Sequence, residues 1–71
     1  MNLSDKELLN RIISAYGSIL AAVEDGAGEG ICYSCGYIQE DVEPDAECYE
    51  CDECGEYAVS GIENALLKCI H

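Results

Sequence analysis

The chain has 71 residues, of which fifteen are Asp or Glu and three are Lys or Arg, so its formal net charge is −12. No basic residue occurs between Arg11 and Lys68, an interval with thirteen acidic residues. Because phosphate contacts depend on Lys and Arg, this composition argues against direct binding of DNA or RNA. No stretch reaches the roughly 18 apolar residues of a membrane span, so we expect no membrane association.

Six cysteines in so short a chain indicate that folding is supported by disulfides or by a metal. The cellular compartment decides between these two possibilities. The first ten residues include Asp5 and Glu7, whereas a secretory signal begins with basic residues. We therefore expect a cytoplasmic protein with reduced thiols, in which paired Cys-x-x-Cys motifs act as metal ligands.

Residues 1–25 predict an amphipathic helix. Ser4 and Glu7 fit a capping box at its start. We expect the helix to pass through Gly17 and to end near Glu24, because the run EDGAGEG is turn material. A wide apolar stripe at helical spacing is formed by Leu8, Leu9, Ile12, Ile13, Tyr16, Ile19, Leu20 and Val23.

Part of this stripe also approximates a seven-residue repeat, which is typical of paired helices. The repeat raises a homodimer through the N-terminal helix as an alternative to packing inside the domain. Two heptads make only a weak coiled coil, so the stripe serves either the core or an interface. The residues of the repeat are Leu9, Ile12, Tyr16, Ile19 and Val23.

Residues 26–60 predict a zinc ribbon. The segments CYSCG (32–36) and CDECG (51–55) are two Cys-x-x-Cys-Gly knuckles. In each knuckle two thiolates clasp one ion while backbone amides point at the sulfurs, and the glycine accepts the turn that follows. Two facing knuckles give tetrahedral coordination by four thiolates, the closed geometry of structural zinc. The predicted ligands of a structural Zn²⁺ are Cys32, Cys35, Cys51 and Cys54.

Cys48 complicates this assignment. It lies three residues before Cys51, so Cys48, Cys51 and Cys54 also resemble part of an iron–sulfur run. Asp52 stands where a knuckle formed by the first two would have glycine, and no further cysteine followed by proline completes the run. We therefore expect Cys48 to be a small apolar residue on the strand that enters the second knuckle.

Residues 61–71 predict a short C-terminal helix. Ser60 and Glu63 repeat the capping-box pattern. Cys69 is expected to be a buried thiol on this helix, and His71 a frayed residue that binds no metal. The apolar face of the helix comprises Ile62, Leu66 and Ile70.

Together these segments predict one small α+β domain over residues 1–71. Catalysis is not expected. Four thiolates close the coordination sphere and leave no position for water, so a Lewis-acid role is disfavoured. The single histidine is residue 71, and the acidic runs are typical of a solvated face.

The run ICYSCG…VEPDAECYECDECGEYAVSGIENALL resembles small zinc-ribbon proteins encoded by tailed bacteriophages and prophages. The resemblance covers about residues 30–67, and its V-E-P-D block is more distinctive than the cysteines. It implies the same four ligands with Cys48 outside, a phage product acting inside a bacterium, and no particular activity. The matching positions are Ile31, Cys32, Cys35, Val42, Glu43, Pro44, Asp45, Cys51, Cys54, Gly55 and Val59.

Two functional hypotheses follow. In the first, the protein is an interaction module whose acidic face docks on a basic surface of a host nucleic-acid-handling protein and inhibits it. In the second, it is a structural, assembly or regulatory accessory module that works through the apolar helix stripe, and the charge only keeps it soluble. The acidic face comprises Glu40, Asp41, Glu43, Asp45, Glu47, Glu50, Asp52, Glu53 and Glu56.

Overall fold

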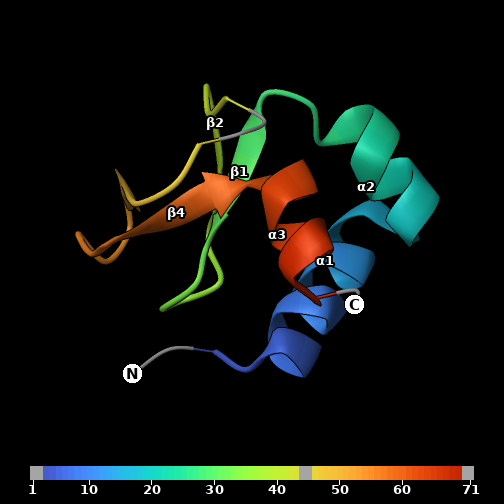
Figure 1. The fold of residues 1–71 in the computed structure, drawn as a ribbon, viewed down its shortest axis with the longest axis horizontal. Helices are drawn as coiled ribbons and strands as arrows, with labels where there is room; N and C mark the ends of the chain where they lie inside the picture. Colours follow the sequence, from blue (N-terminus) through green and yellow to red (C-terminus); the bar gives the residue numbers. More distant parts are fainter. Residues whose placement is uncertain (1–2, 44–45, 70–71) are drawn as a thin grey trace.

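The computed structural model describes residues 3–43 and 46–69. The helices gather on one side of a small antiparallel sheet, as Figure 1 shows. The predicted α+β class, with N-terminal helix, cysteine-bearing hairpins and C-terminal helix, is thus confirmed. The elements in chain order are α1 (Asp5–Tyr16), α2 (Ile19–Asp25), β1 (Glu29–Cys32), β2 (Ile38–Glu40), β3 (Tyr49–Glu50), β4 (Tyr57–Gly61) and α3 (Ile62–Cys69).

The N-terminal segment forms two helices, so the expectation of one helix over residues 1–25 was wrong. α1 does begin with the predicted capping box, in which Ser4 and Glu7 each accept the other's backbone N–H at 3.2 Å. It ends at Gly17, whose φ of +97° lies in the left-handed region that other residues rarely adopt. Ser18 then caps α2 through its hydroxyl. Gly17 ends one helix and Ser18 caps the start of the next. These two local signals outweigh the apolar periodicity, which continues across both residues.

This break divides the apolar stripe into a buried and an exposed part. On α1, Leu8 and Ile12 are fully buried. On α2, Ile19, Leu20 and Val23 are 37%, 68% and 40% exposed. The residues of the seven-residue repeat therefore lie on two separate helices. A coiled coil needs them on one continuous helix, so the repeat no longer argues for a dimer. Dimerisation through this segment stays a prediction.

The sheet has the strand order β2-β1-β4-β3, and all neighbouring strands are antiparallel. The β1–β2 hairpin contains the first knuckle and the β3–β4 hairpin contains the second, as predicted. The two hairpins join through the central strands, where Ile31 pairs with Ser60 and Cys32 with Val59. This pairing places the two knuckles at the same end of the sheet.

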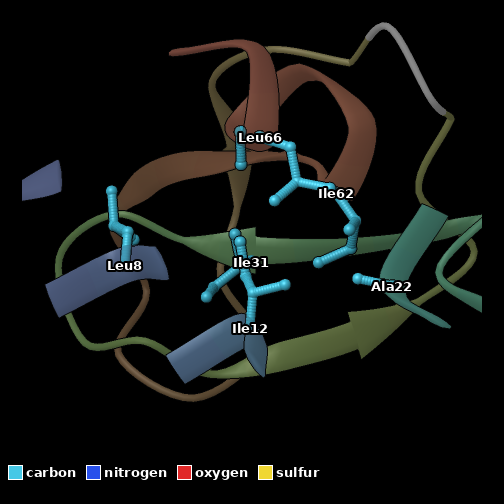
Figure 2. Packing of buried hydrophobic residues seen from close by; sticks show 7 residues of the cluster. Leu8, Ile12, Ala22, Ile31, Ile62 and Leu66 are labelled. Atoms are coloured by element: carbon cyan, nitrogen blue, oxygen red, sulfur yellow. The ribbon is translucent and has the colours of Figure 1, made fainter. Parts of the chain in front are cut away.

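Two apolar clusters flank β1, because successive side chains of a strand point to opposite faces. Ile31 faces the helices, whereas Cys32 faces the other way. Figure 2 shows the larger cluster, the helical core, in which side chains from α1, α2, α3 and β1 converge. The helical core comprises Leu8, Ile12, Ala22, Ile31, Ile62, Ala65 and Leu66. The smaller cluster, the metal-side core, comprises Cys32, Val42, Ala46, Cys51 and Val59.

α3 follows β4 without a connecting loop. Ser60, the predicted cap, is a buried residue of β4, so the capping box expected there was wrong. Lys68 on α3 forms an ion pair with Asp5 on α1 at 2.7 Å, with both side chains partly exposed. The side chain of Cys69 and the expectations for Ile70 and His71 lie outside the described residues. Among α1, α2 and α3, none has the length and apolarity needed to cross a membrane.

Candidate metal centre

The first knuckle connects β1 to β2. Its leading sulfur, Cys32 Sγ, accepts the backbone N–H groups of Ser34 at 3.3 Å and Cys35 at 3.4 Å. The Gly36 N–H donates to the Cys32 carbonyl at 2.9 Å, and the Cys32 N–H donates to the Tyr37 carbonyl at 2.9 Å. Gly36 has a φ of +80°, which explains why glycine follows the second cysteine.

The second knuckle connects β3 to β4 and repeats this pattern. Cys51 Sγ accepts the backbone N–H groups of Glu53 and Cys54, each at 3.4 Å. The Gly55 N–H donates to the Cys51 carbonyl at 2.9 Å, and the Cys51 N–H donates to the Glu56 carbonyl at 2.8 Å. The backbone of each knuckle thus directs two amide N–H groups at one sulfur.

The structure brings together the four cysteines that the sequence predicts as metal ligands. Their Sγ atoms all lie within 4.8 Å of one another. Across the two knuckles, Cys32 Sγ is 3.7 Å from Cys54 Sγ, and Cys35 Sγ is 3.6 Å from Cys51 Sγ. A tetrahedral ion with metal–sulfur bonds of about 2.3 Å holds its sulfurs about 3.8 Å apart. A disulfide needs about 2 Å, so the spacing fits a four-thiolate metal site.

The site is covered on one side only. Cys32 is 0% and Cys51 2% exposed, whereas Cys54 is exposed to solvent. The buried sulfurs belong to the metal-side core, to which Val42 and Val59 contribute the branched side chains. Val42 begins the V-E-P-D block, so part of that block covers the metal centre. Pro44 and Asp45 lie outside the described residues.

The thiols differ in acidity. The pKa of Cys35 is raised to about 12, chiefly by burial and also by hydrogen bonds with the other cysteine sulfurs, while a hydrogen bond from the Tyr37 backbone acts to lower it. Burial also acts to raise the pKa of Cys51, but the backbone N–H groups of Cys54 and Glu53 outweigh it and lower the pKa to about 7. Four thiolates this close repel one another, so full ionisation requires a cation among them. A divalent soft or borderline metal meets that requirement.

Cys48 does not join the sulfur cluster within the described part of the chain. It is exposed and has a φ of +58°, and β3 begins only at the next residue, Tyr49. The expected place on a strand was therefore wrong. The iron–sulfur alternative required Cys48 beside Cys51 and Cys54, and the geometry gives it no such position.

Gln39 was missed by sequence reasoning. Its side-chain carbonyl accepts the Asp52 N–H at 3.0 Å, and its amide donates to the Glu50 carbonyl at 3.2 Å. Gln39 lies on β2 and Glu50 on β3, the two edge strands of the sheet. The amide therefore bridges the open edges beside the metal centre and fixes one knuckle against the other. No local sequence signal marks a glutamine for this role.

The surface around the metal centre is strongly acidic. Within the described residues, the predicted acidic face is exposed throughout, and Asp45 lies outside them. The basic residue Arg11 of α1 reaches the first knuckle, where its guanidinium lies beside Gly36. The exposed members of the acidic face are Glu40, Asp41, Glu43, Glu47, Glu50, Asp52, Glu53 and Glu56.

The chain matches no family model, no curated protein and no solved structure. The resemblance to phage zinc-ribbon proteins therefore stays a prediction, and the metal centre is interpreted from its own geometry.

Proposed function

We propose that the protein is a non-enzymatic module in which a structural Zn²⁺ holds a ribbon that contacts another protein. The observation that supports this proposal is the cluster of four sulfurs within 4.8 Å, which two knuckles with matching hydrogen bonds form. Cys32, Cys35, Cys51 and Cys54 would hold the ion, which links the two hairpins and contributes its binding energy to folding.

Zinc is favoured over other thiophilic metals by the donor set. Four thiolates at tetrahedral spacing suit Zn²⁺ or iron, and Zn²⁺ needs no redox partner. With four protein ligands the coordination sphere is complete, so the ion has no free position at which to activate water. This closed sphere supports a structural role and a protein without enzymatic activity.

The acidic face is our first candidate for the contact surface. Its eight described residues are all exposed, and residues 26–60 contain no Lys or Arg. Four thiolates with one divalent ion add a further net charge of about −2. Such a field accelerates docking on a basic surface. A nucleic-acid-handling protein of a bacterial host carries that kind of surface, and occupying it would inhibit the host protein in the cytoplasm.

A pull-down from bacterial lysate, repeated with excess duplex DNA, tests this function. We expect a nucleic-acid-handling protein to be retained and to be displaced by the DNA. Asp52→Asn combined with Glu53→Gln should weaken retention. The matched control, Glu24→Gln with Asp25→Asn, removes an equal charge from α2 and should not. Equal retention by both double variants contradicts docking through the acidic face.

The helices supply a second candidate surface. Leu20 on α2 and Leu67 on α3 are 68% and 73% exposed, which places apolar side chains in solvent away from the metal centre. In this alternative the protein is a structural, assembly or regulatory accessory module. Its partner then packs on the helices, and the acidic face serves solubility. Retention of a partner that DNA does not displace favours this alternative.

A further inference from the structure

An apolar groove runs between α2 and α3 on the helical side of the molecule. Its volume is about 260 Å³. The residues that line this α2–α3 groove are Ile19, Val23, Glu63, Leu66 and Leu67. Leu66 is 5% exposed and forms the floor, whereas Leu67 is 73% exposed and forms one rim. The groove thus combines a rigid base that belongs to the helical core with side chains that lose water on binding.

The helix break at Gly17 creates this groove. The break separates α2 from α1, and within α2 Ile19 and Val23 lie one turn apart on one face. α2 also packs against α3, so that face borders Leu66 and Leu67. The part of the stripe that the break removed from α1 becomes a wall of the groove.

The charges beside the groove are acidic. Among its described lining residues, the charged one is Glu63, and the chain as a whole has a formal net charge of −12. Lys68, beside Leu67, is engaged with Asp5 at 2.7 Å and lies 5.0 Å from the Tyr33 ring centroid. An apolar floor with an acidic border matches an apolar ligand face flanked by cationic side chains.

We propose that the α2–α3 groove binds an amphipathic helix with a basic polar face, presented by another protein. The inference rests on the proposed function, since it assumes that the protein works by contact with a partner. Two helices with an open apolar seam are a common receptor for a third helix, whose anchors recur every three or four residues. Lys and Arg beside those anchors would face Glu63 in the field of a chain with a formal net charge of −12.

A second copy of this chain fits the groove poorly. Each copy carries a formal charge of −12, so the acidic borders of two grooves would face one another. A stable interface also buries about 800 Å² per partner. Four exposed side chains on two short helices, Ile19, Leu20, Val23 and Leu67, supply only part of that area.

The test uses a synthetic peptide of leucine and lysine, about 18 residues long, with leucines at helical spacing. A permuted peptide of the same composition, without the apolar face, is the ligand control. Binding is followed by fluorescence anisotropy near 0.15 M salt, where long-range attraction is screened. We expect the amphipathic peptide to bind and the permuted peptide to bind at least about tenfold more weakly. Equal binding of the two peptides overturns the proposal.

Leu67→Ser is the deciding variant, because this exposed side chain can be changed without disturbing the core. We expect this variant to bind the amphipathic peptide about tenfold more weakly than wild type does. Tyr57→Ser is the matched control, since Tyr57 is 68% exposed but lies on β4 near the metal centre, and it should leave binding unchanged. Circular dichroism and metal content should be the same for both variants and wild type.

Three results would overturn the proposal that the α2–α3 groove binds a basic amphipathic helix. In the first, Leu67→Ser leaves peptide binding unchanged but Asp52→Asn with Glu53→Gln weakens it. This result assigns the contact to the acidic face, and the proposed function then stands without the groove. Absence of peptide binding at any concentration tested rejects the groove, while the lysate pull-down judges the proposed function independently. Reversible dimerisation that Leu67→Ser disperses, seen by sedimentation, makes a second copy the occupant.

Discussion

The two clusters of this domain are stabilised by different means. The helical core contains five fully or nearly buried large aliphatic residues, contributed by three elements distant in sequence. The metal-side core has two valines, and its other members are an alanine and two cysteines. Burial can hold the helical side together, but the ribbon side has too little apolar area for that. The large residues of the helical core are Leu8, Ile12, Ile31, Ile62 and Leu66.

This difference indicates how a metal bound by the four cysteines would take the place of an apolar core in the ribbon. Most residues of the ribbon are in turns or are cysteines and exposed carboxylates. The remaining apolar residues cover only one side of the four sulfurs. A metal ion bound by the four cysteines would close the other side by joining the two knuckles, which lie at the end of the β1–β4 pairing. Its binding energy is then folding energy for the ribbon, so the two regions should respond differently to the same perturbation.

Loss of a ligand should have the largest effect. Cys51→Ser removes a buried sulfur that accepts two amide hydrogen bonds, and we expect the variant to lose bound zinc and the protection of knuckle amides from hydrogen exchange. Structural zinc contributes on the order of 10 kcal/mol, comparable with the whole stability of a small domain. Metal analysis and hydrogen exchange measure both changes. Retention of one zinc per chain by Cys51→Ser would show that the ion lies elsewhere.

Cys48→Ser is the control for this experiment. Cys48 is exposed and lies outside the sulfur cluster of the described residues, so the variant should keep one zinc per chain. Metal loss in this variant would instead place Cys48 among the ligands.

A truncation in the helical core should cost less and leave the metal in place. Ile12 is fully buried, so Ile12→Ala removes its packing and leaves a cavity, which lowers the free energy of unfolding by about 2–4 kcal/mol. Zinc stoichiometry should stay at one per chain, because the knuckles are closed by their own hydrogen bonds. Denaturant titration with parallel metal analysis makes the measurement. Loss of zinc in the folded Ile12→Ala variant would mean that the two regions are not separable in this way.

The acidity of the thiols gives a smaller, graded effect. The pKa of Cys35 is raised to about 12, chiefly by burial, so this thiol is protonated at neutral pH and must release its proton when metal binds. Zinc affinity should therefore rise with pH, by about tenfold per unit for each proton released. Competition with a chelator between pH 6 and pH 8, roughly one unit either side of neutrality, measures the slope. An affinity independent of pH over that range contradicts binding by protonated thiols.

The sequence was informative where a structure is specified by neighbouring residues. The capping box at Ser4 and both knuckles depend on residues within a few positions, and the four sulfurs do come together. Local signals failed where they competed. Apolar periodicity crossed Gly17, but the left-handed turn and the Ser18 cap prevailed, and at Ser60 pairing with Ile31 prevailed over a capping pattern.

Contacts between distant segments could not be predicted in this way. Gln39 and Asp52 are thirteen positions apart, and their hydrogen bond exists only because the sheet brings its two edge strands close on one side. A glutamine on an edge strand is ordinarily a solvated residue. The α2–α3 groove is a similar case, since it depends on how the second helix turns after the break.

The Gln39 bridge supplies the smallest effect that still separates the two regions. Gln39→Ala removes two hydrogen bonds at 3.0 and 3.2 Å between the edge strands, and we expect a loss of about 1–2 kcal/mol in the free energy of unfolding. Glu40→Ala, at the exposed neighbour, is the matched control and should change stability by less than about 0.5 kcal/mol.

The bridge also has a kinetic consequence that the helical core lacks. Because Gln39 fixes one knuckle against the other, its loss should speed the release of zinc to a chelator, whereas Ile12→Ala should change that rate less. Zinc release followed with a chromogenic chelator separates the two variants at equal temperature and pH. If Gln39→Ala releases zinc at the rate of wild type, the ion and the β1–β4 pairing hold the hairpins in register without the amide bridge, which then contributes only stability.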